Sequence, residues 1–172
     1  MPTPCYLSVF GKNQGLITKG ASGVDSIGDR YVEGHEDQLI IQSVGHTSLI
    51  PCDRQSGQPT GQRIHGPFKV VCEITKALPL FYNALCTGEL LENVTLDWYR
   101  ISVEGKTERF FQTTLINAQV TNIELLMPDS RYLESKPFTQ FVNLSFSFRC
   151  IEWNHMMSNT LGIDNWRKPV EA

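Results

Sequence analysis

Motifs of the common enzyme classes are missing from the sequence. It contains no Walker A loop, no GxSxG elbow and no GxGxxG after a strand. Its histidines, His35, His46, His65 and His155, are widely spaced, and none has the HxxxH or HExxH spacing of a zinc site. The sequence therefore predicts a protein that is not an enzyme and that needs no metal and no cofactor.

Two of these histidines allow a structural interpretation. His35 precedes Glu36, Asp37 and a predicted strand, where successive side chains diverge, so we expect solvated polar residues rather than a joint site. His65 lies between Ile64 and Gly66, and we expect a hydrogen-bonded turn residue rather than a general base.

An excess of basic residues is also absent. The chain has 15 Lys and Arg against 18 Asp and Glu, a net charge of −3, which gives no reason to expect a nucleic-acid partner. No stretch approaches the 18 or so apolar residues of a membrane span, so no membrane insertion is expected. The first residues, MPTPCYLSVFGKN, lack the basic and apolar regions of a secretory signal peptide. We therefore expect synthesis in the cytoplasm and export only by another machine.

Paired cysteines are lacking as well. The five cysteines are scattered without a CxxC pair, and their odd number argues against a complete disulfide framework. Cys72 and Cys150 fall on apolar faces of predicted strands, where a free thiol behaves as a small hydrophobic side chain. We expect structural thiols made in a reducing compartment.

The stretch Ile64–Tyr99 is the best-defined part of the chain. Apolar and polar residues alternate over Phe68–Thr75, which predicts a half-buried strand. The spacing then becomes helical over Leu78–Cys86, with Pro79 suited to the first turn and Gly88 suited to a left-handed stop. A strand, one short helix and a second strand therefore form the expected core.

The remainder of the 172 residues reads as β structure within one domain, residues 1–172. The other predicted strands are Cys5–Phe10, a short piece around Leu16–Thr18, Asp37–Val44, Val94–Val103, Thr107–Thr113, Thr114–Leu125 and Phe141–Trp153. From about Asn154 we expect an irregular polar tail. No parallel βαβ rhythm occurs, so a mainly β, antiparallel barrel or a two-sheet sandwich is predicted, and the pattern does not separate the two.

Polar residues in two regions suggest surfaces that do more than face solvent. Gly45–Arg63 is the longest irregular polar segment, and so long a loop is typically either a contact loop or a mobile hairpin. Asp37–Val44 is polar in patches on both faces, and Asn143, Ser145 and Ser147 share a face of another strand. Such strands suit a wet wall or a contact between subunits.

Aromatic residues leave one alternative open. A ligand cavity inside the barrel is possible, although core packing is the better interpretation of aromatic residues at strand spacing. The residues concerned are Trp98, Tyr99, Phe110, Phe111, Phe146 and Phe148.

An ordered set of short motifs resembles a known family. The set is Arg63-Ile64-His65-Gly66-Pro67-Phe68, Glu73-Ile74-Thr75, Leu78-Pro79-Leu80 with Ala84, and Trp98-Tyr99-Arg100, together with Pro4-Cys5-Tyr6-Leu7, Trp153 and Asn165-Trp166. With these residues the chain resembles the haemolysin-coregulated protein (Hcp) family, which forms the inner tube of the type VI secretion system. The resemblance runs from about Pro2 to Arg167.

The resemblance implies a barrel with the helix packed at one side and a structural role without catalysis. It implies homohexameric rings, similar to phage tail-tube subunits, that stack inside a contractile sheath beneath a VgrG spike. Contraction would expel the tube, and the ring lumen would carry and stabilise effector proteins. A ligand-binding barrel with an apolar pocket and a phage-like tail-tube protein remain the alternatives.

The resemblance also implies two sets of contact residues. The loop that reaches an adjacent ring corresponds to Gly45–Arg63, with Arg54, Gln55, Ser56 and Gln58 at its tip. The inner-wall strand corresponds to Asp37–Val44, with Gln42 and Ser43 as candidates for the lumen. A slip of one residue exchanges the two faces of a strand, so the sequence does not decide which of the two points inward.

Overall fold

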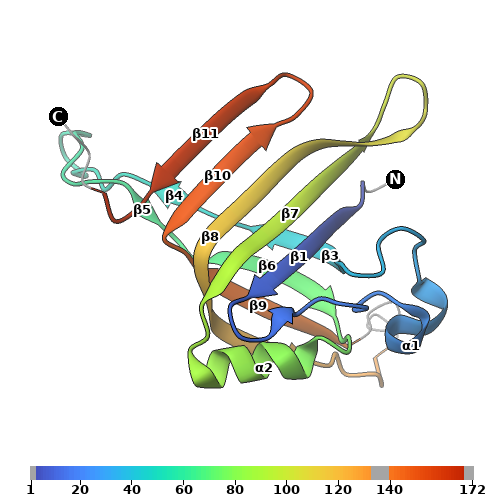
Figure 1. The fold of residues 1–172 in the computed structure, drawn as a ribbon. Coiled ribbons are helices and arrows are strands. Elements are labelled where there is room, and N and C mark those ends of the chain that lie inside the picture. The colour runs from blue at the N-terminus through green and yellow to red at the C-terminus, as the bar shows by residue number, and fades with distance from the viewer. Residues whose placement is uncertain (1–2, 133–139, 169–172) are drawn as a thin grey trace.

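The structure is a computed structural model that describes residues 3–132 and 140–168 (Figure 1). The strands in this part of the chain are β1 (Cys5–Gly11), β2 (Gly15–Leu16), β3 (Leu39–Gly45), β4 (Ser48–Leu49), β5 (Ile64–His65), β6 (Phe68–Glu73), β7 (Leu91–Ile101), β8 (Thr107–Leu126), β9 (Phe141–Ser147), β10 (Cys150–His155) and β11 (Thr160–Asn165). The helical elements are α1 (Val24–Ile27), a 3-10 turn over Gly28–Arg30 and α2 (Leu78–Thr87).

Six strands form a ring of antiparallel pairs. The order is β8-β7-β1-β3-β6-β9, and β9 pairs back onto β8. Figure 1 shows the barrel with α2 lying across its lower end and the β7–β8 and β10–β11 hairpins extending beyond its upper end. The predicted antiparallel β-barrel is therefore confirmed.

The β8 strand is longer than predicted. The expected strands Thr107–Thr113 and Thr114–Leu125 form one strand of 20 residues. Its first half pairs with β7, and its other edge pairs with β10 and then with β9. No glycine or proline interrupts it. It kinks at Asn117, which has a left-handed φ of 51°, and its register against β9 shifts between Val120 and Asn122.

The predicted strand Phe141–Trp153 is interrupted. β9 ends at Ser147 and β10 begins at Cys150, and both run along the same edge of β8. The break lies at Phe148 and Arg149, next to the kink at Asn117. Beyond the break Ile151 is buried and Cys150 is only half-buried, so the alternation changes phase there.

The helix α2 confirms the predicted helix. It carries Pro79 in its first turn and ends at Gly88, whose φ of 66° and ψ of 31° are left-handed. Phe81 and Ala84 are its buried residues, and the Phe81 ring packs against Phe146 of β9. The four-residue α1 is an additional helix that the sequence pattern did not predict.

The prediction of an irregular tail from about Asn154 is wrong. β10 continues to His155, and β11 returns beside it as an antiparallel edge strand. Leu161 and Ile163 of β11 are exposed, so the strand has no buried side of the kind that creates an alternating pattern. Gly162 lies beneath Trp153, where a β-carbon would sit 3.5 Å from the indole ring.

Apolar side chains fill the barrel interior. The most deeply buried members come from every strand of the ring, with exposures of 1% or less: Leu7, Val9, Leu39, Val70, Leu96, Leu115, Leu144 and Phe146. The cross-section of so small a barrel is occupied by packed side chains and leaves no channel.

Candidate assembly surfaces

The outer face of β3, β6, β9 and the second half of β8 is polar. Residues in register across it are Ser43, Val71, Asn143 and Glu124. Asn143 Nδ2 donates a hydrogen bond of 3.0 Å to Glu124 Oε2. A shallow depression of about 340 Å³ lies over these strands. We call this face the polar wall, defined by Ser43, Lys69, Val71, Asn122, Glu124, Asn143 and Ser145.

A β-bulge decides how Gln42 and Ser43 are placed. Ile41 pairs with Cys72 and Ser43 with Val71, so Gln42 is the extra residue between them. Both Gln42 and Ser43 are exposed. Gln42 Nε2 donates to Glu73 Oε1 at 2.9 Å, and Ser43 lines the depression of the polar wall. The bulge therefore turns both neighbouring side chains to the outer surface.

Only part of the polar face predicted for Phe141–Trp153 lies in the polar wall. Asn143 and Ser145 belong to the polar wall. Ser147 lines a different cavity beside Arg149 and Arg167.

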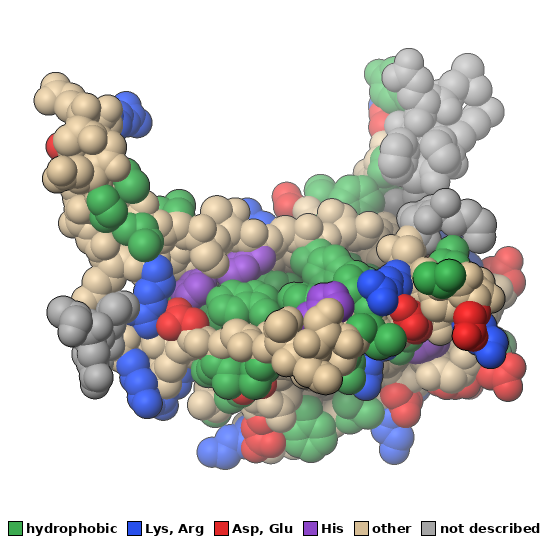
Figure 2. Space-filling view, turned by 90° about the horizontal axis from the view of Figure 1, so that it is seen from above, with side chains coloured by type: hydrophobic (Ala, Val, Ile, Leu, Met, Phe, Trp, Pro, Cys, Tyr) green, Lys and Arg blue, Asp and Glu red, His purple; other side chains and the backbone are tan. Residues whose placement is uncertain are grey.

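The segment Gly45–Arg63 forms a projecting arm, which Figure 2 shows at the left with hydrophobic side chains at its base. β4 and β5 pair at the base, and a bridge joins Cys52 to Pro59 further out. Asp53 N donates to the Gln58 carbonyl at 2.9 Å near the tip. The arm is thus a hydrogen-bonded hairpin.

The tip of the arm is exposed on all sides. Arg54, Gln55, Ser56 and Gln58 all lie there and are all exposed, and Gln55 N donates to Asp53 Oδ1 at 2.7 Å. The exposed apolar residues Leu49, Ile50 and Ile64 lie at its base.

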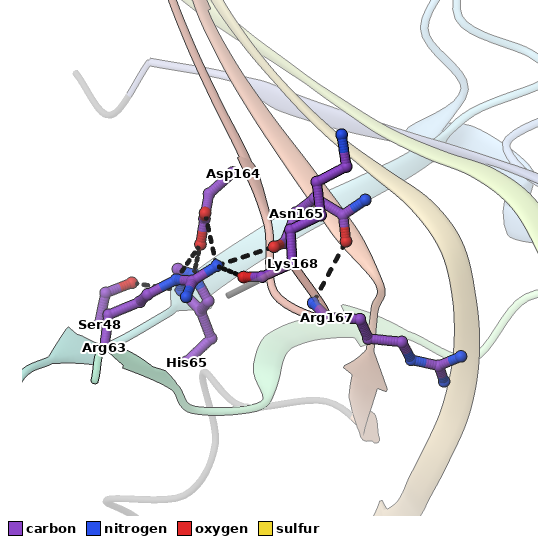
Figure 3. Close-up of polar contacts among 7 residues, drawn as sticks. All are labelled: Ser48, Arg63, His65, Asp164, Asn165, Arg167 and Lys168. Atoms are coloured by element: carbon purple, nitrogen blue, oxygen red, sulfur yellow. Dashed lines mark hydrogen bonds and ion pairs between the residues drawn. The ribbon is translucent and has the colours of Figure 1, made fainter. Parts of the chain in front are cut away.

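A network that we call the anchor joins the arm to β11 (Figure 3). Arg63 donates from Nε and Nη2 to the two carboxylate oxygens of Asp164, both at 3.0 Å. Arg63 Nη2 also donates to the carbonyls of Asn165 and Lys168 at 2.8 and 3.0 Å. This bidentate pairing fixes the arm to the last strand.

His65 extends the anchor toward the core. Its Nε2 lies 2.7 Å from Asp164 Oδ2, and its Nδ1 lies 2.8 Å from Ser48 Oγ. The side chain is only 3% exposed. The predicted hydrogen bonding of His65 agrees with these contacts, but the residue lies in β5 rather than in a turn. Sequence reasoning missed Asp164, because a partner about a hundred residues away leaves no local pattern.

Two residues in or beside the anchor have a lowered pKa. The hydrogen bond from Arg63, with help from His65, lowers the pKa of Asp164 and keeps its carboxylate charged. His46 stacks beside His65 with ring centroids 5.6 Å apart. Burial and then the proximity of His65 lower the pKa of His46, whose Nε2 is buried without a hydrogen-bond partner among the described residues.

The prediction of a solvated His35 is wrong, because this residue is half-buried in a second polar cluster. Its ring stacks on Tyr6 at 3.7 Å, and its Nδ1 lies 2.6 Å from Gln38 Oε1. Gln38 Nε2 donates to the buried Asp97, which also pairs with Arg109. These contacts hold the segment before β3 against the barrel.

The aromatic residues belong mostly to packing contacts. Phe146 is fully buried and Phe148 is 6% exposed. Trp98 packs edge-on against Phe111, and its Nε1 donates to Thr113 Oγ1 at 3.2 Å. This arrangement suits core packing rather than a ligand cavity.

Within residues 3–132 and 140–168 no group of three His, Cys, Asp or Glu residues is placed to hold a metal ion. The five cysteines are free. In the same part of the chain no helix is long and apolar enough to cross a membrane.

Known proteins resemble this chain along almost its full length. A family model described as "Type VI secretion system effector, Hcp" matches residues 6–155. The major exported protein of Pseudomonas aeruginosa is 44% identical over 170 residues, which cover 99% of both chains.

Solved structures agree with this match. One described as "Crystal structure of Hcp protein" has a TM-score of 0.92 at 43% identity and covers 98% of this chain and 100% of its own. The secreted protein Hcp3 from Pseudomonas aeruginosa has a TM-score of 0.83 at 38% identity and covers 97% of this chain and 100% of its own.

Proposed function

The chain belongs to the Hcp family and is a tube protein of the type VI secretion system, and we propose that it builds the tube as stacked homohexameric rings. The family and the exported relative also make it a secreted, oligomerising component. The match of sequence and fold along almost the whole chain carries this proposal.

The tube would act without catalysis. Sheath contraction would drive it out beneath a VgrG spike, and effector proteins would travel inside it. A ligand-binding barrel is not favoured by the comparisons, since the chain resembles Hcp proteins over nearly its full length. We propose that residues 1–172 form a single tube domain of the Hcp type.

The apolar, closely packed interior of the barrel supports a ring. Leu7, Leu96 and Phe146 are at most 1% exposed, so the barrel itself offers no conduit. A water-filled lumen must therefore lie between protomers, lined by an outer face of each barrel. We propose that the polar wall is that face, because it is broad, polar and slightly concave.

Ser43 belongs to this wall, and Gln42 precedes it on β3 with its amide bonded to Glu73. Both are exposed on β3, and Ser43 stands in register with Val71 and Asn143. Small polar side chains keep such a wall open to a folded cargo. We propose that they contact effectors.

The arm suits contact with an adjacent ring. It projects from the barrel, is internally hydrogen-bonded and is fixed by Arg63 and Asp164, so it is ordered before it binds. A pre-ordered element loses less conformational entropy on association. We propose that Arg54, Gln55, Ser56 and Gln58 make the contact between rings.

Native mass measurement with negative-stain imaging tests the ring. We expect a mass about six times that of the 19.4 kDa chain, together with annular particles. A monomer at tens of micromolar, with no rings in the images, would contradict the proposal.

Two variants separate the wall from the arm. Ser43→Arg should leave rings intact and lower the amount of effector that copurifies with them. The control variant Lys106→Glu, at the β7–β8 turn, should keep both the rings and the amount of effector unchanged. Deletion of residues 55–61 should leave hexamers intact and stop tube growth in the secretion assay. Normal effector levels or normal secretion in these variants would remove the wall or the arm from its proposed role.

A further inference from the structure

A cavity of about 550 Å³ lies at the kink of β8, on the side of the barrel opposite α1. Asn117 and Gln119 of β8 and Ser147 at the end of β9 supply polar groups, and Leu90 and Trp166 supply apolar surface. The left-handed backbone of Asn117 and the break between β9 and β10 open this cavity.

Two arginines make the cavity basic. Arg149 and Arg167 both line it, whereas Asp and Glu are absent from its lining. Both are exposed, and neither forms an ion pair within residues 3–132 and 140–168. Figure 3 shows the Arg167 side chain pointing away from Asp164, the nearest carboxylate of the anchor. Two guanidinium groups without counterions fit a partner that carries carboxylates.

The opposite side of the molecule is acidic. Residues 25–37 contain five Asp and Glu but a single Arg. That residue, Arg30, is bonded to Glu73. Asp25, Asp29 and Glu33 are exposed, and no ion pair joins them to a described residue. Figure 2 shows several Asp and Glu side chains at the right of the molecule, with Lys and Arg side chains among them.

We propose that the Arg149–Arg167 cavity of one protomer receives the acidic α1 segment, Val24–Glu33, of the next copy of this chain. The inference rests on the proposed ring and names the two surfaces that join its neighbours. Different patches on opposite sides of one subunit give a heterologous contact, which closes into a ring when the rotation is right.

Apolar side chains match across this contact as well. Val24 is 63% exposed and Tyr31 is 39% exposed, beside the acidic residues. Trp166 is 37% exposed at the cavity. An aromatic side chain with flanking arginines is the kind of centre that protein interfaces use. The α1 segment is therefore complementary to the cavity in charge and also offers apolar side chains that can pack against it.

Charge reversal tests the pairing. Arg149→Glu with Arg167→Glu should convert the wild-type hexamer into folded monomers at a concentration where the wild type is fully assembled. Asp25→Arg with Asp29→Arg should do the same. Combining the four substitutions should restore the hexamer, because the reversed charges attract again. Lys106→Glu with Arg131→Glu changes the net charge equally, outside both surfaces, and should stay hexameric.

Native mass spectrometry and circular dichroism read out assembly and folding together. A hexameric wild type with a hexameric Arg149→Glu/Arg167→Glu variant would overturn the inference and leave the ring in place. Monomers that the acidic substitutions do not rescue would overturn the choice of the α1 segment as partner. A monomeric wild type would overturn the proposed ring and the inference with it.

Discussion

The anchor between the arm and β11 predicts the effect of Asp164→Ala. The substitution removes two hydrogen bonds from Arg63 and the contact with His65, whose side chain is 3% exposed. Hydrogen bonds to charged groups contribute about 1.5–3 kcal/mol each, and a buried group left unpaired costs about 1–3 kcal/mol. Because the Asp164 side chain is itself 28% exposed, water can replace part of the lost hydrogen bonding. We expect the free energy of unfolding to fall by about 3 kcal/mol in total. That corresponds to a fall in Tm of roughly 6–12 °C for a domain of this size.

Thermal unfolding at a fixed protein concentration measures this loss, and hydrogen exchange of residues 45–65 measures its local part. Asp53→Ala is the matched control, since its carboxylate lies at the exposed tip and should cost well under 1 kcal/mol. The double variant with Arg63→Ala should show a coupling of about 1–3 kcal/mol. If the two single effects add within about 0.5 kcal/mol, the pair does not act as a unit and the reasoning fails.

Three further predictions follow from single residues. The pKa of His46 is lowered in the folded state, so at mildly acidic pH the unfolded chain binds a proton that the folded chain does not. The free energy of unfolding should therefore decrease as pH falls below about 6.5. His46→Phe should make this pH dependence weaker in denaturation experiments at several pH values. Gly88→Ala should cost about 1–2 kcal/mol by urea unfolding, because φ is 66° there with open space around the position, and Ala at exposed Thr87 should cost less. Burial raises the pKa of Cys72 to about 12, so a thiol reagent should modify exposed Cys52 in the native protein and leave Cys72 unmodified until unfolding; equal rates would refute the burial.

Local patterns predicted the local structure. Pro79 and Gly88 set the limits of α2 because a first-turn proline and a left-handed glycine act within one helical turn. The alternation of Phe68, Val70 and Cys72 predicted β6 for the same reason, since each residue is judged against its immediate neighbours.

Irregularities of the strands escaped prediction. The bulge at Gln42 adds one residue to β3, and alternation alone cannot show where such a residue is inserted. The break at Phe148 was missed for the same reason, because it lies opposite the kink at Asn117 on the neighbouring strand and leaves no sign in the alternation. Both irregularities decide which side chains reach a surface, and the bulge exposes both Gln42 and Ser43 where regular alternation would expose only one of them.

Pairs of residues far apart in the chain could not be predicted from the sequence for a different reason. Arg63 and Asp164 lie 101 residues apart, and only the return of β11 beside β10 brings Asp164 to the arm. Because β11 is an exposed edge strand, it has little apolar pattern, and the segment was expected to be an irregular tail. The cavity of Arg149 and Arg167 depends on the same return of the chain.

The division between interior and surface has a consequence for how such a tube can vary. The barrel interior is closely packed, so exchanging a residue such as Phe146 changes stability by creating a cavity or by overpacking. The polar wall carries Ser43 and Asn143 on strands whose opposite faces are already fixed by the core. Side chains there can change without disturbing the packing that sets the barrel. In the assembly that we propose, the barrel can therefore keep its core while the wall changes to suit different cargo, because core and wall lie on opposite faces of the same strands.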